Sequence, residues 1–256
     1  MNIDIHAHIL PGLDDGPETL AESLAMAQAC VKAGYATVIA TPHVIPGLYD
    51  NTRGAILAAV RQLQAELDAG GIPLRVLPGA EYHLSPDLPH LVATGELLTL
   101  NDTGKYLLVE LPLQEVPAYA PQVLFDLLVS GITPVIAHPE RNDYLVRHPG
   151  ALAEMVRNGI LAQVTAASLT GLFGGETRRA AARFIKDGTA HFVATDAHGP
   201  GRRLEAGPQA ARLFPAQSTA LFHDHPAAVI CGTALPCPAH QKPPEHCRFT
   251  LFGRKK

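Results

Sequence analysis

The sequence has no tryptophan, only 5% aromatic residues and four cysteines among 256 residues. So few cysteines exclude a scaffold built on disulfides. Lys and Arg number 20 against 24 Asp and Glu, and the formal net charge of −4 argues against a nucleic-acid-binding protein held by its charge. No apolar run approaches the ~20 residues of a membrane-spanning helix. Met1 leads directly into Asn2 and Ile3 without a secretory signal, so we expect a cytoplasmic protein with no membrane span.

Apolar residues and histidine are well represented. Apolar residues make up 47% of the chain, which is enough for one sizeable core. The 13 histidines matter because histidine is the commonest metal ligand and a frequent carrier of protons near neutral pH. Cys30 falls in a predicted helix and Cys231 in another apolar stretch, so we expect both cysteines in the core.

Short apolar runs alternate with helical patterns along the chain. Runs typical of strands cover residues 2–6, 37–41, 74–78, 106–110, 133–137, 161–164 and 191–194. Helical spacing covers residues 17–34, 56–67, 120–130, 151–159 and 177–187. Such alternation predicts an α/β fold with a parallel sheet, and about seven units predict a single-domain distorted (β/α)7 barrel with its chemistry at the carboxyl ends of the strands.

The last residues differ in composition from the rest. We expect one domain over residues 1–235 and a disordered Pro/Cys/His-rich basic tail over residues 236–256. Cys237, His240, His246 and Cys247 are zinc-type ligands, but their spacing does not match a zinc finger. The three basic residues at its end, Arg254, Lys255 and Lys256, are a candidate contact for an acidic partner or a membrane surface.

Histidines and acids stand at or just after the ends of most of the predicted strands. These nine residues are His6, His8, Asp14, His43, Glu81, Glu110, His138, Asp196 and His198. Parallel strands bring their carboxyl ends to one rim, so we expect these side chains to meet there. Mixed imidazole and carboxylate donors suit Zn²⁺, Mn²⁺ or Fe²⁺. Nine ligands are more than one ion needs, so the sequence predicts several ions bridged by carboxylates.

The order and spacing of these motifs resemble a known family. The chain resembles PHP-type (polymerase and histidinol phosphatase) phosphoesterases, and more narrowly the bacterial tyrosine-protein phosphatases encoded with capsule and exopolysaccharide genes (CpsB/CapC-like). The resemblance covers residues 1–235, and the motifs that carry it are DIHAHILPGLDDG from Asp4, ATPH from Ala40, GAEY from Gly79, LVELP from Leu108, IAHPER from Ile136 and ATDAH from Ala194.

The resemblance implies a distorted barrel of PHP type with three divalent ions, commonly Mn²⁺, with Zn²⁺ or Fe²⁺ as alternatives. By analogy the first ion is held by His6, His8, Glu81 and Asp196, the second by Glu81, Glu110 and His138, and the third by Asp14, His43 and His198. By analogy with some relatives, the chain is also a candidate to form a homo-oligomer.

Two arginines match residues that the family uses on phosphate. Arg141 follows His138 by three positions and Arg203 follows His198 by five, and the planar guanidinium suits phosphate oxygens. Arg202 is the alternative to Arg203 in the same loop. Asp196 and His198 are candidates for protonating the leaving group. No cysteine has an arginine six positions later, so a phosphocysteine intermediate is not expected and metal-activated water is the predicted nucleophile.

The predicted activity is hydrolysis of a phosphomonoester. Protein phosphotyrosine as the substrate, on a tyrosine autokinase of capsule or exopolysaccharide synthesis, is implied only by the resemblance. Tyr49, Tyr82 and Phe173 are candidates to flank a substrate ring. The alternatives are a small-molecule phosphatase of the histidinol phosphatase kind, a nuclease-like phosphodiesterase and a metal-loaded binding module without catalysis. The acidic net charge argues against the nuclease.

Overall fold

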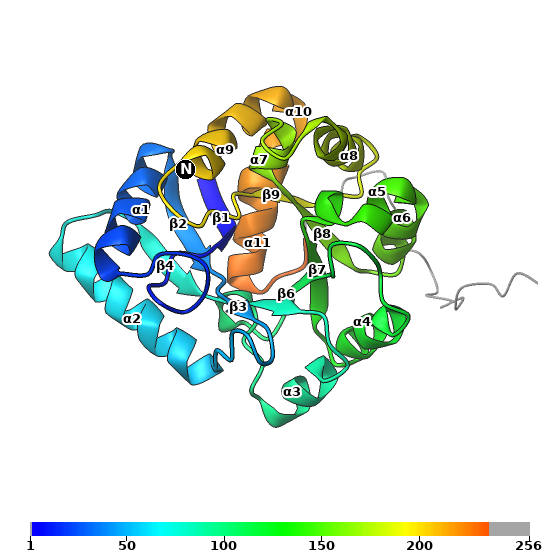
Figure 1. Ribbon diagram of the computed structural model, residues 1–256, viewed down its shortest axis with the longest axis horizontal. Helices are drawn as coiled ribbons and strands as arrows, with labels where there is room; N and C mark the ends of the chain where they lie inside the picture. Colours follow the sequence, from blue (N-terminus) through cyan, green and yellow to red (C-terminus); the bar gives the residue numbers. More distant parts are fainter. Residues whose placement is uncertain (1, 236–256) are drawn as a thin grey trace, which may run out of the picture.

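The structure is a computed structural model that describes residues 2–235 (Figure 1). Its strands are β1 (Asn2–Ala7), β2 (Tyr35–Ala40), β3 (His43–Val44), β4 (Arg75–Pro78), β5 (Glu81–His83), β6 (Tyr106–Glu110), β7 (Thr133–Ala137), β8 (Leu161–Thr165) and β9 (Phe192–Ala194). Its helices are α1 (Leu20–Lys32), α2 (Arg53–Ala69), α3 (Leu88–Thr94), α4 (Ala120–Val129), α5 (Asp143–Arg147), α6 (Pro149–Arg157), α7 (Ala166–Leu169), α8 (Gly175–Lys186), α9 (Arg202–Leu213), α10 (Pro215–Thr219) and α11 (His225–Cys231). Two 3-10 turns are η1 (Leu100–Asp102) and η2 (Pro139–Arg141), and η3 (Ala220–Asp224) is a π-helical segment.

All the strand pairs are parallel and form two sheets. The orders are β1-β2-β4 and β3-β5-β6-β7-β8-β9. The chain passes from the first sheet to the second at residues 41–42 and again at residues 79–80. At the other edge, the His8 N–H donates to the Ala197 carbonyl at 2.8 Å, just beyond β9. The predicted α/β fold with parallel strands is confirmed, whereas the described residues do not pair into a single closed sheet.

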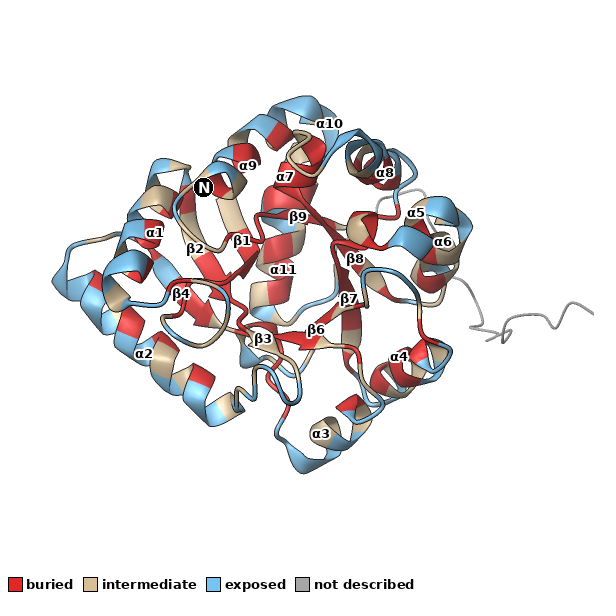
Figure 2. Cartoon of the chain, viewed as in Figure 1, coloured by how far each residue is buried: buried red, intermediate tan, exposed pale blue. Residues whose placement is uncertain are grey.

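Two groups of buried apolar side chains hold these layers together. The larger group lies between the strands and the surrounding helices, and Figure 2 shows buried positions on the strands and on the inward faces of those helices. The smaller group takes side chains from strands of both sheets together with Val229 of α11, and its strand members are Ile5, Ile39, Leu77, Tyr106, Leu108, Val135, Ala137, Phe192 and Ala194. The strands are therefore apolar on both faces, as parallel strands covered on both sides must be.

Local sequence signals explain where the helices begin and which face they bury. The Thr19 hydroxyl accepts from the Glu22 N–H, and the Glu22 carboxylate accepts from the Thr19 N–H, which is a capping box. Helix α2 buries one side of its surface, composed of Ile56, Val60, Leu63 and Leu67. This spacing of about one helical turn is typical of an amphipathic helix.

The cysteine and membrane predictions have separate outcomes. Cys30 is buried in α1, as predicted. The prediction for Cys231 is wrong: this residue is exposed, because it is the last residue of α11 and the core-facing positions of that helix come before it. Among the described residues, no helix combines the length and apolarity needed to cross a membrane. The predicted tail over residues 236–256 lies outside the described residues.

Candidate metal centre

The nine predicted residues come together at the carboxyl ends of the strands. His6 belongs to β1, His43 begins β3, Glu81 begins β5 and Glu110 ends β6. The others follow strands, and Asp14 lies farther on in the loop between β1 and α1. The surroundings of these residues are mostly buried: His6, His8 and Glu81 have no exposed surface. Short contacts between their side chains link all nine residues into one cluster.

Four buried side chains form the innermost group. The Nε2 atoms of His6 and His8 are 3.2 Å apart. The Glu81 Oε2 atom lies 3.2 Å from the His6 Nε2 atom and 3.4 Å from the His8 Nε2 atom. The Asp196 Oδ1 atom lies 3.4 and 3.5 Å from the same two nitrogens. Ligands at about 2.0–2.2 Å from a tetrahedral ion are about 3.3–3.6 Å apart, so this spacing fits a metal ion.

Glu81 also faces a second group of donors. Its Oε1 atom lies 3.1 Å from the His138 Nε2 atom, which is 3.6 Å from the Glu110 Oε1 atom. The His43 Nδ1 atom lies 3.1 Å from the Glu81 Oε2 atom. Neither this nitrogen nor this oxygen has a hydrogen-bond partner among the described residues. A buried carboxylate oxygen without a partner is costly, and a cation bound by Glu81 would satisfy its Oε2 atom.

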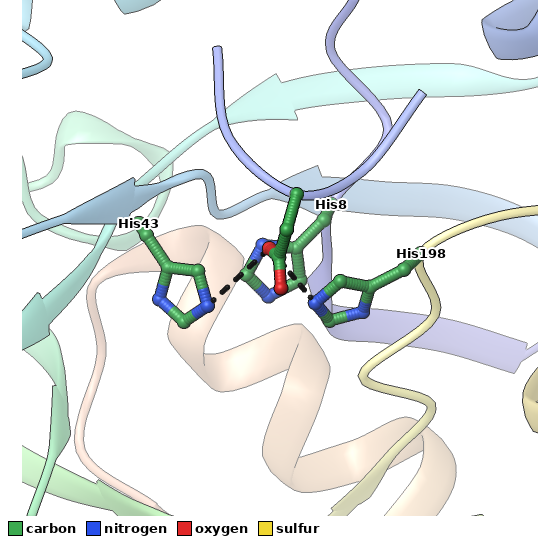
Figure 3. Close-up of side chains that lie close together, drawn as sticks. His8, His43 and His198 are labelled. Carbon is green, nitrogen blue, oxygen red and sulfur yellow. Dashed lines mark ion pairs between the residues drawn. The ribbon is translucent and has the colours of Figure 1, made fainter. Parts of the chain in front are cut away.

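A third group of donors gathers around His43 and His198. Figure 3 shows the imidazole rings of His8, His43 and His198 facing one another. The Asp15 Oδ1 atom lies 3.2 Å from the His198 Nε2 atom and 3.6 Å from the His43 Nε2 atom. The sequence interpretation missed Asp15, because it singled out the adjacent acid, Asp14, in the same loop.

Asp14 is placed differently from Asp15. Its Oδ2 atom lies 2.6 Å from the His8 Nδ1 atom and accepts from the His43 backbone N–H at 3.0 Å. Its Oδ1 atom accepts from the Gly16 N–H at 3.0 Å. Asp14 therefore orients the His8 ring, which keeps the His8 Nε2 atom directed towards Glu81. Carboxylates in this position are common partners of metal-binding histidines.

Gln163 of β8 orients the His6 ring as Asp14 orients the His8 ring. Its buried Oε1 atom lies 2.7 Å from the His6 Nδ1 atom. The sequence has no histidine or acid at the end of β8, and this strand contributes a supporting amide instead. A buried glutamine within an apolar strand was the available signal for such a role.

Both predicted arginines contact the centre through Asp196. The Arg141 Nη1 atom donates to the Asp196 Oδ2 atom at 2.7 Å, and the Arg203 Nη1 atom donates to it at 3.1 Å. The Arg203 Nη1 atom is also 2.8 Å from the His198 Nδ1 atom. Arg202 is exposed and lines a separate cavity with Glu205. The geometry therefore favours Arg203 over Arg202 at the site.

The three aromatic candidates have different positions. Tyr82 is buried and its hydroxyl accepts from the Leu98 N–H at 2.8 Å, so it belongs to the core. The Tyr49 ring stacks on His43 with centroids 5.8 Å apart. Phe173 lies beneath the Arg141 and Arg203 guanidiniums. Only Tyr49 and Phe173 therefore lie at the rim of the site.

The two central carboxyl groups are held in their ionised forms. Burial by itself would raise the pKa of the Glu81 carboxyl, but the imidazoles around it, beginning with His6, hold that pKa well below its usual range. Burial would also raise the pKa of Asp196, but the neighbouring histidines, beginning with His6, lower it further than burial raises it. Burial and the adjacent His8 lower the pKa of His198 to about 4. Ionised carboxylates and imidazoles are the donors that Mn²⁺, Zn²⁺ and Fe²⁺ bind.

Two of the site residues have an unusual backbone. His138 and Asp196 have φ values of 31° and 51°, in the left-handed region that residues other than glycine rarely adopt. Each follows a buried strand, β7 or β9, and the turn directs the side chain into the cluster. Strain of this kind is concentrated at functional sites.

The fold and the site together define a class: a parallel α/β protein with a cluster of histidines and carboxylates, able to hold metal ions, at the carboxyl ends of its strands. The chain belongs to the family described as capsular polysaccharide synthesis, CpsB/CapC, which it matches over residues 2–215. The prediction of a bacterial capsule-type family is thus confirmed.

Relatives with names and solved structures support this membership. The chain is 45% identical over 196 residues to the tyrosine-protein phosphatase YwqE of Bacillus subtilis, covering 77% of each chain. It is 33% identical over 196 residues to the putative tyrosine-protein phosphatase CapC of Staphylococcus aureus, covering 77% of this chain and 76% of that one. A chain from the crystal structures of YwqE from Bacillus subtilis and CpsB from Streptococcus pneumoniae, described as unique metal-dependent tyrosine phosphatases, matches with a TM-score of 0.85 and 38% identity, covering 91% of this chain and 96% of that one.

Proposed function

We propose that this protein is a metal-dependent phosphomonoesterase that hydrolyses phosphotyrosine in proteins. The observation that carries the proposal is the buried group of His6, His8, Glu81 and Asp196, whose donor atoms have the spacing of a metal site and adjoin two arginines. The relatives named as tyrosine phosphatases support the choice of substrate.

The two sheets are best explained as parts of one distorted seven-stranded barrel of PHP type, formed by the domain of residues 1–235. In this interpretation β2 with β3, and β4 with β5, each form one bent strand, because only two residues separate the members of each pair. The bridge between Ala7 and Ala197 would join the first strand to the last. The smaller apolar group, which draws side chains from strands of both sheets, supports a filled barrel interior.

Three divalent ions, with Mn²⁺ as the first choice and Zn²⁺ or Fe²⁺ as alternatives, match the number of donors. The first ion would be held by His6, His8, Glu81 and Asp196, and the second by Glu81, Glu110 and His138. The third would be held by His43, His198 and Asp15, which takes the place first given to Asp14. Bound ions of this kind lower the pKa of water and neutralise charge on a phosphoryl group.

The remaining residues bind and orient the phosphoryl group. Arg141 and Arg203 offer planar donors to its oxygens at the rim of the centre. Asp196 and His198 were candidates to protonate the leaving group. The lowered pKa of each leaves it without a proton near neutral pH, which supports a role for both as ligands. The tyrosyl oxygen, with a pKa near ~10, leaves more readily than an alkoxide and needs less help.

The physiological partner proposed is a tyrosine autokinase of capsule or exopolysaccharide synthesis in the cytoplasm. The family description supports the link to capsular polysaccharide synthesis. A partner that presents phosphotyrosine on a chain segment also fits a site at the rim of the molecule, since Arg141 and Arg203 are partly exposed.

The test is phosphate release from a phosphotyrosine peptide by chelator-stripped protein, before and after Mn²⁺ is added back. We expect turnover only with the metal, and no loss after alkylation of thiols. The Glu81→Gln variant, which keeps the shape of the side chain, should lose both activity and bound metal. If the protein hydrolyses histidinol phosphate but not the phosphotyrosine peptide, it is a small-molecule phosphatase and the proposed substrate is wrong. Inactivity on both compounds would contradict the proposal that it is an enzyme.

A further inference from the structure

Two arginines from distant parts of the chain share one aromatic ring. Arg141 ends the short turn η2 after β7, and Arg203 lies in the first turn of α9. The Cζ atom of Arg141 lies 5.0 Å from the centroid of the Phe173 ring, and that of Arg203 lies 5.4 Å from the same centroid. Both distances are within the range of a cation–π interaction.

These arginines share one carboxylate, although Arg203 also donates to the Asp196 backbone carbonyl at 2.5 Å and lies 2.8 Å from the His198 Nδ1 atom. Both donate to one oxygen, Asp196 Oδ2, at 2.7 and 3.1 Å, and no other carboxylate in the described part of the chain pairs with either. Two guanidiniums that converge on one atom repel each other. In the proposed function the Asp196 carboxylate also binds an ion, so it neutralises even less of the charge on the two arginines. The negative face of the Phe173 ring is therefore a second attraction that holds the pair together.

The chain segment just before the ring is connected through α7 to the turn that carries Arg141. Glu140, in that turn, is buried, and its Oε1 atom accepts from the Thr165 N–H at 2.8 Å and from the Ser168 hydroxyl at 2.7 Å. Thr165 is the N-cap residue of α7, and Ser168 lies within this helix. The Leu172 N–H then donates to the Ala167 carbonyl at 2.9 Å, which holds the segment just before Phe173 against that helix. The turn, the helix and the segment just before the ring thus form a connected unit.

We propose that Phe173 is a positioning residue for the phosphate-binding arginines. Its ring holds both guanidiniums over one surface, so that their donors converge beside the metal centre before substrate arrives. This inference rests on the proposed function of the site. Phe173 acts through Arg141 and Arg203 and does not stack on the substrate, so its effect extends to any phosphate monoester.

The test compares Phe173→Leu, which keeps apolar bulk without a π face, with Phe173→Tyr, which retains the face. For Mn²⁺-loaded protein, we expect the leucine variant to lose about tenfold in kcat/KM and the tyrosine variant to keep near-normal activity. The loss should be equal for a phosphotyrosine peptide and for β-glycerophosphate, which has no ring. Inhibition by inorganic phosphate should weaken by the same factor, with metal content unchanged.

Three results would overturn the inference. These are unchanged kinetics in Phe173→Leu, a loss confined to the phosphotyrosine peptide, and a further loss when Phe173→Leu is added to an Arg141→Ala/Arg203→Ala background. Phe173→Met replaces the leucine variant if circular dichroism shows that the latter is unfolded. If the wild-type protein turns over neither substrate, the proposed function fails, but titration with inorganic phosphate still compares the variants and judges the role of Phe173 separately.

Discussion

Asp14 and Asp15 are neighbours in the sequence with different surroundings. Asp14 is bonded to His8 and to two backbone N–H groups, whereas Asp15 is half exposed and faces His43 and His198. We expect Asp15→Asn to lose about one third of the bound manganese, because a ligand of one proposed ion is removed. Asp14→Asn should keep all the ions but bind them about 10–100-fold more weakly, because His8 is no longer oriented.

Metal analysis after dialysis against graded Mn²⁺ concentrations measures both effects. Asp87→Asn is the matched control, since Asp87 is exposed and makes no side-chain capping bond. A normal manganese content in Asp15→Asn, together with loss of an ion in Asp14→Asn, would restore the original assignment of Asp14 as the ligand.

His191 lies away from the proposed metal ligands and gives a prediction about pH. Burial and the neighbouring His225 lower its pKa from 6.5 to about 4, and its Nδ1 atom accepts from the Ala162 N–H at 3.2 Å. The unfolded chain binds a proton here at a higher pH than the folded one. The free energy of unfolding should therefore decrease as the pH falls from about 6.5 towards 4, by up to about 3 kcal/mol from this residue.

Urea unfolding of chelator-treated protein at pH 7 and pH 5 measures this effect without bound metal. His191→Asn keeps an acceptor for the Ala162 N–H but does not titrate, so its stability should fall less over the same interval. Equal pH dependence in the two proteins would show that another group is responsible.

At the scale of single residues, much of the site could be predicted from sequence. His138 directly follows an apolar run and Asp196 follows another after one residue, and parallel strands bring such positions to one rim. Asp14 and Asp15 lie in a loop, where no periodicity tells which of two adjacent carboxylates points inward. The supporting role of Gln163 depends on a contact with His6 that joins positions far apart in the chain.

At the scale of elements, the sequence predicted the alternation but not the breaks within it. Strands β3 and β5 are two and three residues long and follow Pro42 and Ala80, too short for a pattern of their own. Their pairing, His43 with Glu81, places two proposed ligands side by side. Only the three-dimensional path of the chain reveals that the first sheet passes into the second at these points.

The contact between β2 and α9 depends on a glycine. A Cβ atom at Gly207 of α9 would overlap the hydroxyl oxygen of Tyr35, which is buried and has no hydrogen-bond partner among the described residues. We expect Gly207→Ala to reduce the free energy of unfolding by about 1–3 kcal/mol, despite the better helix propensity of alanine. Adding Tyr35→Phe removes the overlapping atom and should recover part of the loss.

Urea unfolding of the two single variants and the double variant measures this coupling. Gly54→Ala in α2 is the control, because no atom lies within 4 Å of the position of its Cβ. If Gly207→Ala is as stable as the wild-type protein, or if Tyr35→Phe recovers nothing, the close packing of α9 on β2 does not limit stability.

At the scale of the whole molecule, the site joins the beginning of the chain to its later part. Asp4 of β1 accepts from the Thr195 N–H at 3.0 Å, and the Asp196 N–H donates to the His6 carbonyl at 2.9 Å. In Figure 1, β1 and β9 lie next to each other, with α11 in the middle of the surrounding elements. The innermost group therefore forms only when the domain is assembled, and metal binding should be linked to folding as a whole.

This linkage predicts a loss of thermal stability when the metal is removed. A ligand present at 100 times its Kd stabilises the folded state by about 2.7 kcal/mol. For a domain of this size, that corresponds to about 5–10 °C in Tm, so chelator should lower the Tm by this amount and Mn²⁺ should restore it. Glu81→Gln should show little of the shift, because Glu81 faces both the first and the second group of donors. A Tm that is independent of Mn²⁺ in the wild-type protein would mean that these buried histidines and carboxylates are already satisfied without an ion, and a shift of equal size in Glu81→Gln would place the stabilising ion elsewhere.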